Sequence, residues 1–394
     1  MANYHQVQKQ GSGQLLSLGI SVYIMLWIAI LNGYPIVFDD TGEYLVISFS
    51  LKQSPYRSIL YSVFIRLVAW GMTPWLIVIV QCAITIYILH CVFEYVVQKS
   101  PKVKSQSLFF LGLVAFLAFA TTLPWHAGQL MPDVFSGLAF LCVFLLLYDS
   151  ELSLGRTVVL SSLLAISAGC HLSNFLSLGL VLSALLFLRA FNKARPYWPI
   201  RSTKGIVVFV LVPILASAGV VVMSNWRAGY GFKLSAGSSV FLLNRLLENG
   251  LAAKYLQEQC KIVQLTPCKH LDNLPLSDDF LWGSNPLLSE MGGWLGAREE
   301  ANRITSGTIR RYPIRFLLDC GKQTLRELVI FKSDDESYPL QSGYTADVFE
   351  RLYPGDFPNI VSQNNGQVGW AGSPKSYTHC IGLYSGRPYA PAWP

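Results

Sequence analysis

Residues 75–97 read WLIVIVQCAITIYILHCVFEYVV, an apolar run whose single charged residue is Glu94. A helix needs about 20 consecutive apolar residues to cross the hydrocarbon core of a bilayer. This run therefore predicts a membrane-spanning helix and sets the class of the protein. The composition agrees, because 13% of the residues are charged and 52% are hydrophobic, whereas soluble domains carry about 25% charged residues.

Six further apolar runs surround this one, and together they predict an all-α polytopic protein with about seven transmembrane helices and a large first external loop. The six runs are Leu15–Phe38, Leu108–Leu123, Val134–Tyr148, Val158–Cys170, Phe175–Leu188 and Ile206–Met223. The first is not a cleaved signal peptide, because its apolar stretch is too long and Asn32–Gly33–Tyr34–Pro35 is no small-residue cleavage site.

The chain divides near residue 224. Residues 1–224 form the predicted transmembrane core, and residues 225–394 have the composition of a water-soluble segment. Helical patterns cover Ser238–Gln259 and Gly296–Phe331, with Pro313 breaking the second pattern into two helices. From Tyr338 onward Gly, Pro, Asn and Tyr dominate, so we expect loop there.

Lys and Arg residues set the orientation, because loops rich in them stay in the cytoplasm. Residues 98–106 carry three lysines, and residues 189–204 carry three arginines and two lysines. This places the N-terminus inside and residues 39–57, 121–133 and 170–174 outside. With seven spans, residues 225–394 are also external. The net charge of +7 then reflects topology and not nucleic-acid binding.

The apolar run Ser58–Trp70 is open to two interpretations. It is short, and if it spanned the membrane the Lys-rich loop after residue 98 would move outside. We therefore expect a helix that lies at the outer surface or dips partly into the bilayer, with a spanning helix as the alternative.

Acidic residues gather in the first external loop, which reads FDDTGEYL over residues 38–45. Asp40 or Thr41 is a suitable N-cap for a helix over Gly42–Leu51, but capping explains one acid and not the cluster of Asp39, Asp40 and Glu43. Acids near a membrane are costly and are typically functional when clustered. The loop is therefore a candidate site.

The pattern Asp40-x-x-x-Tyr44-Leu45 resembles the first-loop signature of GT-C glycosyltransferases, multi-span enzymes such as protein O-mannosyltransferases and the aminoarabinose transferase of lipid A. The resemblance covers about residues 15–224 and continues through Ser54–Tyr61, Gln81 and Met131–Pro132–Asp133. It implies transfer of a sugar from a polyprenyl-phosphate donor to a glycan, lipid or protein acceptor. Family members usually carry further spans after this core, and their Asp-Glu pair is Asp39–Asp40 here.

These residues also suit that chemistry by themselves. Sugar transfer from a phosphate leaving group needs a base near the acceptor hydroxyl, and Asp40 is the candidate. Asp39 would orient it or, together with Asp133, hold a divalent metal (Mg²⁺ or Mn²⁺). Glu43 is expected to face water. Arg57 is the nearest external partner for the phosphate, and Arg66 is a second candidate.

Two histidines at external span ends complete the candidate site. His126 and His171 are either interfacial side chains with satisfied hydrogen bonds or contacts to phosphate or sugar. His90, inside an apolar run, is expected to be packed and satisfied. Asp278–Trp282 is either an acceptor contact or a solvated loop with a buried aromatic residue.

The cysteines lack a metal-binding spacing, although Cys260 and Cys268 could close a short external loop as a disulfide. P-loop, GxGxxG and GxSxG motifs are missing from the sequence. Together with the external acid cluster, the resemblance implies a glycosyltransferase of a bacterial plasma (inner) membrane with an external active site. The alternative is a non-enzymatic transporter or receptor for polysaccharide or lipid, which should bury charges near mid-membrane.

Overall fold

The computed structural model describes residues 2–98, 106–191, 202–274, 279–283, 285–329 and 343–362. The regular structure of these residues is helical, and an isolated parallel bridge joins Ile36 to Gln129. The predicted all-α class is therefore confirmed. Residues 99–105 and 192–201, which hold most of the Lys and Arg residues that set the orientation, lie outside the described part.

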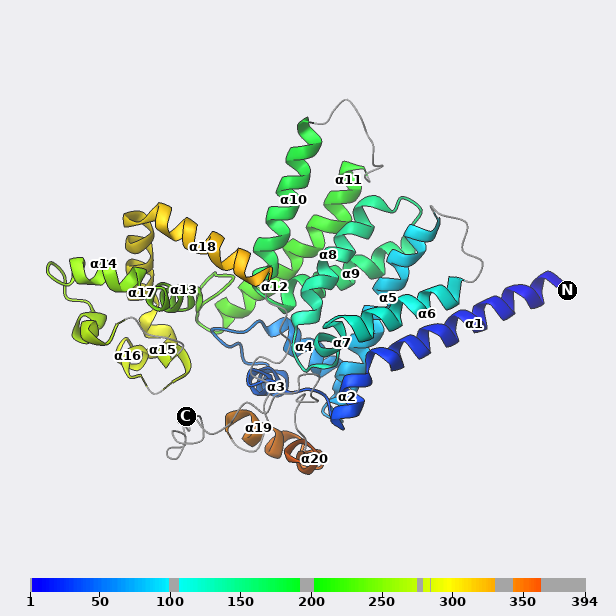
Figure 1. The fold of residues 1–394 in the computed structure, drawn as a ribbon, viewed down its shortest axis with the longest axis horizontal. Coiled ribbons are helices and arrows are strands. Elements are labelled where there is room, and N and C mark those ends of the chain that lie inside the picture. Colours follow the sequence, from blue (N-terminus) through cyan, green and yellow to red (C-terminus); the bar gives the residue numbers. More distant parts are fainter. Residues whose placement is uncertain are drawn as a thin grey trace.

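A first body of helices fills the centre and right of Figure 1 and holds the larger hydrophobic core. Its helices are α1 (Ala2–Met25), α2 (Trp27–Asn32), α3 (Thr41–Ser50), α4 (Ile59–Ala69), α5 (Trp75–Gln98), α6 (Gln106–Ala120), α7 (Leu123–Gly128), α8 (Asp133–Tyr148), α9 (Leu154–Cys170), α10 (Ser173–Phe191), α11 (Thr203–Ile206), the π-helix η1 (Val207–Leu211) and α12 (Val212–Arg227).

Two stretches of helix are long and apolar enough to cross a membrane, namely Trp75–Val97 and Thr203–Arg227. The 24 residues of α5 would reach about 36 Å at 1.5 Å per residue, against a hydrocarbon thickness of about 30 Å. The other apolar stretches of helix in the described chain, such as Gly13–Met25 and Ser173–Phe187, are 10–17 residues long, so the count of seven spans stays a prediction.

The second long stretch is not a regular α-helix, because η1 interrupts it. Pro213 has no backbone N–H to donate to the preceding turn. The carbonyl of Phe209 instead accepts a hydrogen bond from the Ser161 hydroxyl of α9 (2.9 Å). A neighbouring helix thus satisfies the group that proline leaves free, which apolar surroundings require.

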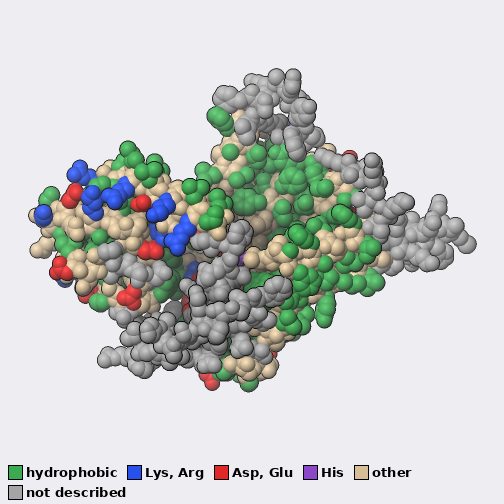
Figure 2. Space-filling view, in the orientation of Figure 1, with side chains coloured by type: hydrophobic (Ala, Val, Ile, Leu, Met, Phe, Trp, Pro, Cys, Tyr) green, Lys and Arg blue, Asp and Glu red, His purple; other side chains and the backbone are tan. Residues whose placement is uncertain are grey.

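Large apolar side chains cover the surface of the first body, whereas charged side chains gather on the second body in Figure 2. Soluble monomers rarely expose apolar patches of more than a few hundred Å². The exposed side chains come from several helices and include Leu108, Phe116, Phe119, Leu176, Leu180, Phe187 and Leu215. This surface suits contact with lipid.

The ambiguous run Ser58–Trp70 contains the 11-residue helix α4, which at about 16 Å is too short to cross a bilayer. The hydroxyl of its N-cap residue, Ser58, donates a hydrogen bond to the Gly169 carbonyl at the end of α9. Further along, Tyr61 is fully buried and donates to the side-chain oxygen of Gln81 on α5 (2.7 Å). These contacts favour a helix wedged among the ends of other helices over a spanning one.

A second body with its own hydrophobic core lies at the left of Figure 1. A disulfide between Cys260 and Cys268 closes one of its loops, as the sequence allowed. The predicted helix over Ser238–Gln259 is divided at Gly250, whose φ is +75°, and the predicted break at Pro313 is confirmed. The helices are α13 (Ser238–Glu248), α14 (Leu251–Gln259), the 3-10 helix η2 (Thr266–Asn273), α15 (Asp279–Trp282), α16 (Leu287–Glu290), α17 (Gly293–Arg311) and α18 (Pro313–Glu327).

The prediction of loop from Tyr338 onward is wrong for two segments, α19 (Tyr344–Leu352) and α20 (Phe357–Val361). Helix α19 packs against α3 and buries Val348 and Phe349 in the core of the first body. Its backbone comes so close to Gly42 that a Cβ there would lie 2.6 Å from the hydroxyl of Thr345. Tertiary packing thus stabilises helices that the Gly- and Pro-rich surroundings hide. Residues 363–394 lie outside the described part.

Candidate functional site

Asp40 is the N-cap residue of α3, but its side chain makes no capping hydrogen bond. Thr41 makes the side-chain hydrogen bonds at the start of the helix. Its hydroxyl accepts from the Phe38 backbone N–H (3.0 Å) and donates to the Leu130 carbonyl (3.2 Å). The Asp40 carboxylate instead forms an ion pair with Arg57. The Asp40 side chain therefore binds a charged partner and does not cap the helix.

Arg57 lies at the end of the loop between α3 and α4, with 14% of its side chain exposed. Gln53 shapes this loop by donating to the backbone carbonyls of Ser54 and Arg57, each at 2.7 Å. The guanidinium carbon of Arg57 lies 5.5 Å from the ring centre of Tyr56 and 5.9 Å from those of Tyr44 and Trp282. Such contacts stabilise a cation that has lost water.

One hydrogen-bond donor of Arg57 is left over. Its Nε is buried and has no hydrogen-bond partner among the described residues. A buried donor without a partner costs free energy, so the guanidinium is arranged for an acceptor beyond Asp40. A planar guanidinium with free N–H groups matches the geometry of phosphate and carboxylate oxygens.

The surroundings of Asp40 raise the pKa of its carboxyl above the ordinary value of 3.8. Burial is the largest cause, the charge and hydrogen bond of Arg57 act in the opposite direction, and the charges of Asp39 and Asp133 raise the pKa further. A carboxylate with a raised pKa is a stronger base. The pKa shift thus agrees with a role in accepting a proton.

The two acid-bearing loops lie side by side. The backbone N–H of Ile36 donates to the Gly128 carbonyl (3.0 Å), and the N–H of Leu130 donates to the Ile36 carbonyl (2.9 Å). Asp133, exposed in the first turn of α8, follows this contact. The structure thus brings Asp40 and Asp133 within electrostatic range, although they are 93 positions apart in the chain.

Glu43 and Asp39 have partners on α19. Glu43, predicted to face water, is half-buried and accepts a hydrogen bond from the Tyr344 hydroxyl (3.0 Å). Thr345 donates to the backbone carbonyl of Asp39. Asp39 itself is exposed. The Glu43 side chain and the Asp39 backbone therefore help to dock α19, a role that the sequence did not indicate.

Aromatic rings of the second body cover the Arg57 loop. Trp294 of α17 lies 4.7 Å from Tyr56 and 5.4 Å from Trp282, measured between ring centres. Phe241 of α13 lies 5.0 Å from Trp294. Trp282 keeps 49% of its surface exposed, whereas Phe280 of the same segment is buried in the core of the second body. The described part of the segment, Asp279–Trp282, thus contains the buried aromatic residue of the second interpretation, and Asp278 lies outside the described residues. Trp294 was missed because no local pattern connects it with residue 57.

Arg66, the second candidate for phosphate binding, lies at the other end of α4 and donates to the carbonyls of Ser48 (3.0 Å) and Phe49 (3.2 Å) at the end of α3. It lines a cavity of about 210 Å³ together with Trp70 and Tyr353. Arg66 and Arg57 are therefore not brought together. About 14 Å of helix rise separates their positions.

The histidines do not join the ion pair in any contact that we observe. His126 is exposed on α7. His171 is half-buried, with its Nδ1 2.7 Å from the Ser173 hydroxyl, which agrees with the interpretation of a satisfied interfacial residue. Gly169, two residues before His171, accepts the Ser58 hydrogen bond, so the end of α9 that precedes His171 contacts the start of α4.

A metal at this site finds no support in the arrangement of side chains. Within the described part of the chain, no group of three His, Cys, Asp or Glu side chains is placed to hold a metal ion. The expected metal ligands Asp39 and Asp133 are both exposed, and Arg57 occupies an oxygen of Asp40. A role for Mg²⁺ or Mn²⁺ stays a prediction without a site.

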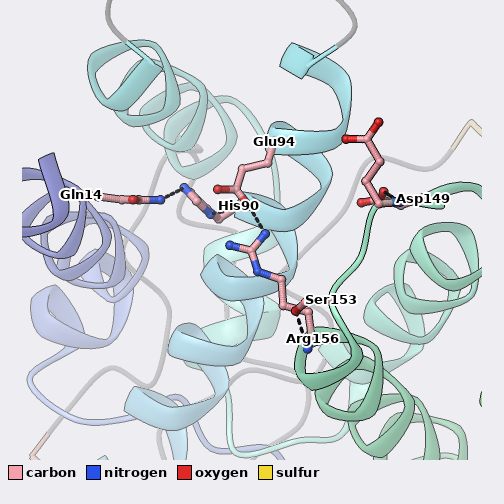
Figure 3. A network of polar contacts seen from close by, with 7 residues as sticks. Gln14, His90, Glu94, Asp149, Ser153 and Arg156 are labelled. Carbon is pink, nitrogen blue, oxygen red and sulfur yellow. Dashed lines mark hydrogen bonds and ion pairs between the residues drawn. The ribbon is translucent and has the colours of Figure 1, made fainter. Parts of the chain in front are cut away.

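A second polar network lies near the far end of α5 (Figure 3). Glu94 accepts a charged hydrogen bond from Arg156 of α9 (2.6 Å) and lies 3.8 Å from His90. His90 in turn is 3.2 Å from the amide nitrogen of Gln14. His90 is thus packed and partnered, as predicted. About 20 Å of α5 separates Gln81 near the candidate site from Glu94.

Compared with known proteins, the chain matches no family model, and it has no significant match to a curated protein or to a solved structure.

Proposed function

We propose that this protein is an integral membrane glycosyltransferase that moves a sugar from a polyprenyl-phosphate donor to an acceptor hydroxyl on the non-cytoplasmic face. The observation that carries the proposal is the largely buried pair of Asp40 and Arg57, in which the arginine keeps an unpartnered Nε. Such a pair offers an anion site and a base within contact of each other, which is what this reaction needs.

Arg57 would bind the donor phosphate through its planar N–H groups. An entering phosphate competes with Asp40 for the guanidinium, and the released carboxylate loses the partner that lowers its pKa. Asp40 then takes the proton of the acceptor hydroxyl while that oxygen attacks the anomeric carbon. The bond from this carbon to the phosphate oxygen breaks, and polyprenyl phosphate leaves with the electron pair.

The rings of Tyr56, Trp282 and Trp294 would form the sugar-binding surface. Binding sites for small organic ligands are lined mainly by apolar and aromatic side chains with a few polar groups. These three rings contact one another, and those of Tyr56 and Trp282 border Arg57. The second body thus supplies acceptor or sugar contacts, and the first body supplies the charges.

The donor class follows from the proposed orientation. With about seven spans and a cytoplasmic N-terminus, the pair faces a compartment without cytosolic nucleotide sugars. A polyprenyl donor reaches this side because its chain stays in lipid. Leu67 and Trp70 on α4 are 69% and 73% exposed, and the cavity beside Arg66 opens at the same end of the helix. The chain would run along this apolar side of α4.

The non-enzymatic alternative has less support. A transporter is expected to carry charges near mid-membrane. Glu94 lies in the last turns of α5 and Arg156 in the first turn of α9, so their pair lies near helix ends.

The direct test of the anion site is binding of a polyprenyl monophosphate to purified protein in lipid nanodiscs. Arg57→Ala should weaken binding roughly 10- to 100-fold, the value of one charged hydrogen bond. The affinity of Arg57→Lys should fall between those of Arg57→Ala and wild type, because lysine keeps the charge but lacks the planar pair of N–H donors that can contact two phosphate oxygens at once. Lys52→Ala is the matched control, since Lys52 is an exposed cation of the same loop. Equal binding by wild type and Arg57→Ala would exclude the proposed phosphate site.

A further inference from the structure

Helix α18 leaves one whole side uncovered. None of its residues, all of which belong to the described chain, is buried. Six large apolar side chains of the helix and its last turn are 67 to 73% exposed: Ile314, Leu317, Leu318, Leu325, Leu328 and Val329. Their spacing places all six on one side of an α-helix.

The opposite side of α18 faces the second body. Phe316, Asp319 and Gln323 are the half-buried residues of the helix, and Phe316 packs against the core of the second body. Their spacing of three and four residues defines one face. The apolar stripe therefore points away from the body to which α18 is attached.

Basic residues border the stripe on one flank. Arg315, Lys322 and Arg326 follow the apolar positions around the helix, and residues 310–329 carry five basic against two acidic residues, a net +3. Residues 225–394 as a whole carry 17 basic and 16 acidic residues, a net +1. Positive charge is thus concentrated along this helix, where Figure 2 shows Lys and Arg side chains on the second body.

The position of α18 in the molecule also suits contact with a membrane surface. It extends from α17 back toward the region of α10 and α12 in Figure 1. At the end of α12, Trp226 and Phe232 stack 5.4 Å apart and are 51% and 68% exposed. Exposed aromatic residues at a helix end are typical of the membrane interface.

We infer that α18 is an interfacial helix whose apolar stripe enters the outer leaflet of a bilayer containing anionic lipid. An amphipathic helix with Lys and Arg on its polar flank binds lipid surfaces in this way. The anchor would hold α17, and with it Trp294, at a fixed height above Arg57. This inference needs the first body to be embedded in lipid, but it does not depend on the reaction.

The test places a single environment-sensitive fluorophore on the full chain in phosphatidylglycerol vesicles. Cys320 and Cys380 are changed to Ser so that they do not take up the label. The other cysteines can stay, because 82, 91, 142 and 170 are buried and Cys260–Cys268 is a disulfide. New cysteines then replace Leu317, Leu325 or, as the matched control on the opposite side, Glu327. A detergent melt of each labelled protein confirms that it is folded.

We expect lipid-borne nitroxide to quench labels at positions 317 and 325 at least twofold more than the label at 327, and aqueous iodide to show the reverse order. Equal iodide quenching at all three positions would mean that the stripe faces water and would overturn the inference. Protection of 317 and 325 that disappears when the protein is diluted into more lipid would also overturn it, because a second copy of the chain would then cover the stripe.

Discussion

At the scale of single residues, the site rests on an acid and an arginine that are removed from water together. Burying charges is expensive, and removing one partner of a buried pair leaves the other uncompensated. Asp40 keeps 28% of its side chain exposed and Arg57 keeps 14%, so the pair is open enough for a ligand to exchange with one partner. A binding site needs a pair that is mostly buried but still open to a ligand, whereas a purely structural pair does not need this opening.

Asp40→Asn tests the base at nearly constant size. The amide keeps most hydrogen bonding but cannot take the proton, and general-base catalysis is worth about 10²–10⁴ in rate. We expect a loss of this order in sugar transfer by purified protein, with an unchanged melt in detergent. Glu43→Gln, which keeps an acceptor for Tyr344, should cost far less. Near wild-type transfer by Asp40→Asn would remove Asp40 from the mechanism.

The pH profile gives an independent check of the same carboxyl. Its pKa is raised above 3.8, and the proposed reaction uses the basic form, so the rate should fall as the pH drops through this raised value. Asp133→Asn removes a charge that raises the pKa and should move the acid limb of the kcat/KM profile to lower pH. Glu43→Gln is the control and should leave the limb in place. A limb that does not respond to Asp133→Asn would mean that another group titrates.

Much of the site was predictable at this scale because acids, arginines and loop positions are visible in the sequence. The pairing of Asp40 with Arg57 was not, since it depends on the loop that Gln53 shapes. Glu43 was assigned to water because its partner Tyr344 is far along the chain. The separation of Arg66 from Arg57 follows from the helix predicted over Ser58–Trp70, because α4 (Ile59–Ala69) places the two arginines at its opposite ends.

At the scale of elements, close helix packing positions α4, and with it Arg57. A Cβ at Gly169 of α9 would lie 2.0 Å from the Cδ1 of Leu60 and 2.3 Å from the hydroxyl of Ser217. Helices α4, α9 and α12 therefore meet at Gly169, where a methyl group fits only if the Leu60 and Ser217 side chains move. This arrangement sets the position of the loop that ends at Arg57.

Gly169→Ala should force the Leu60 and Ser217 side chains out of their present positions and lower stability by about 1–3 kcal/mol, the usual cost of overpacking. Gly179→Ala on α10 is the matched control, because a Cβ there meets no atom within 4 Å, and alanine should stabilise this helix by up to about 1 kcal/mol. Thermal unfolding in detergent measures both. Equal melting temperatures for the two variants would show that Gly169 is not a site of close helix packing.

Elements with a long repeating pattern were predictable, and elements that depend on distant contacts were not. Helix α5 follows its apolar run almost residue for residue. Helix α19 was assigned to loop because Gly and Pro surround it, although Val348 and Phe349 bury against the first body. The π-helix η1 also needed the structure, since its freed carbonyl is satisfied by Ser161 of another helix.

At the scale of the whole molecule, an apolar body carries one polar layer near each end of α5. Asp40, Arg57 and Asp133 belong to the first layer, and Glu94 with Arg156 belongs to the second. The second body covers the first layer through Trp294 and Trp282. A lipid-held donor entering along α4 would therefore meet charges from one body and rings from the other.

The proposed polyprenyl-phosphate donor is tested most directly by measuring turnover by the purified protein in lipid vesicles. One reaction contains a sugar on polyprenyl monophosphate and the other contains the matching nucleotide sugar, with Asp40→Asn as the inactive control in each. We expect release of polyprenyl phosphate, by transfer or hydrolysis, from the wild type in the first reaction and no turnover in the second. Robust turnover of the soluble nucleotide sugar, or equal release by wild type and Asp40→Asn, would contradict the account.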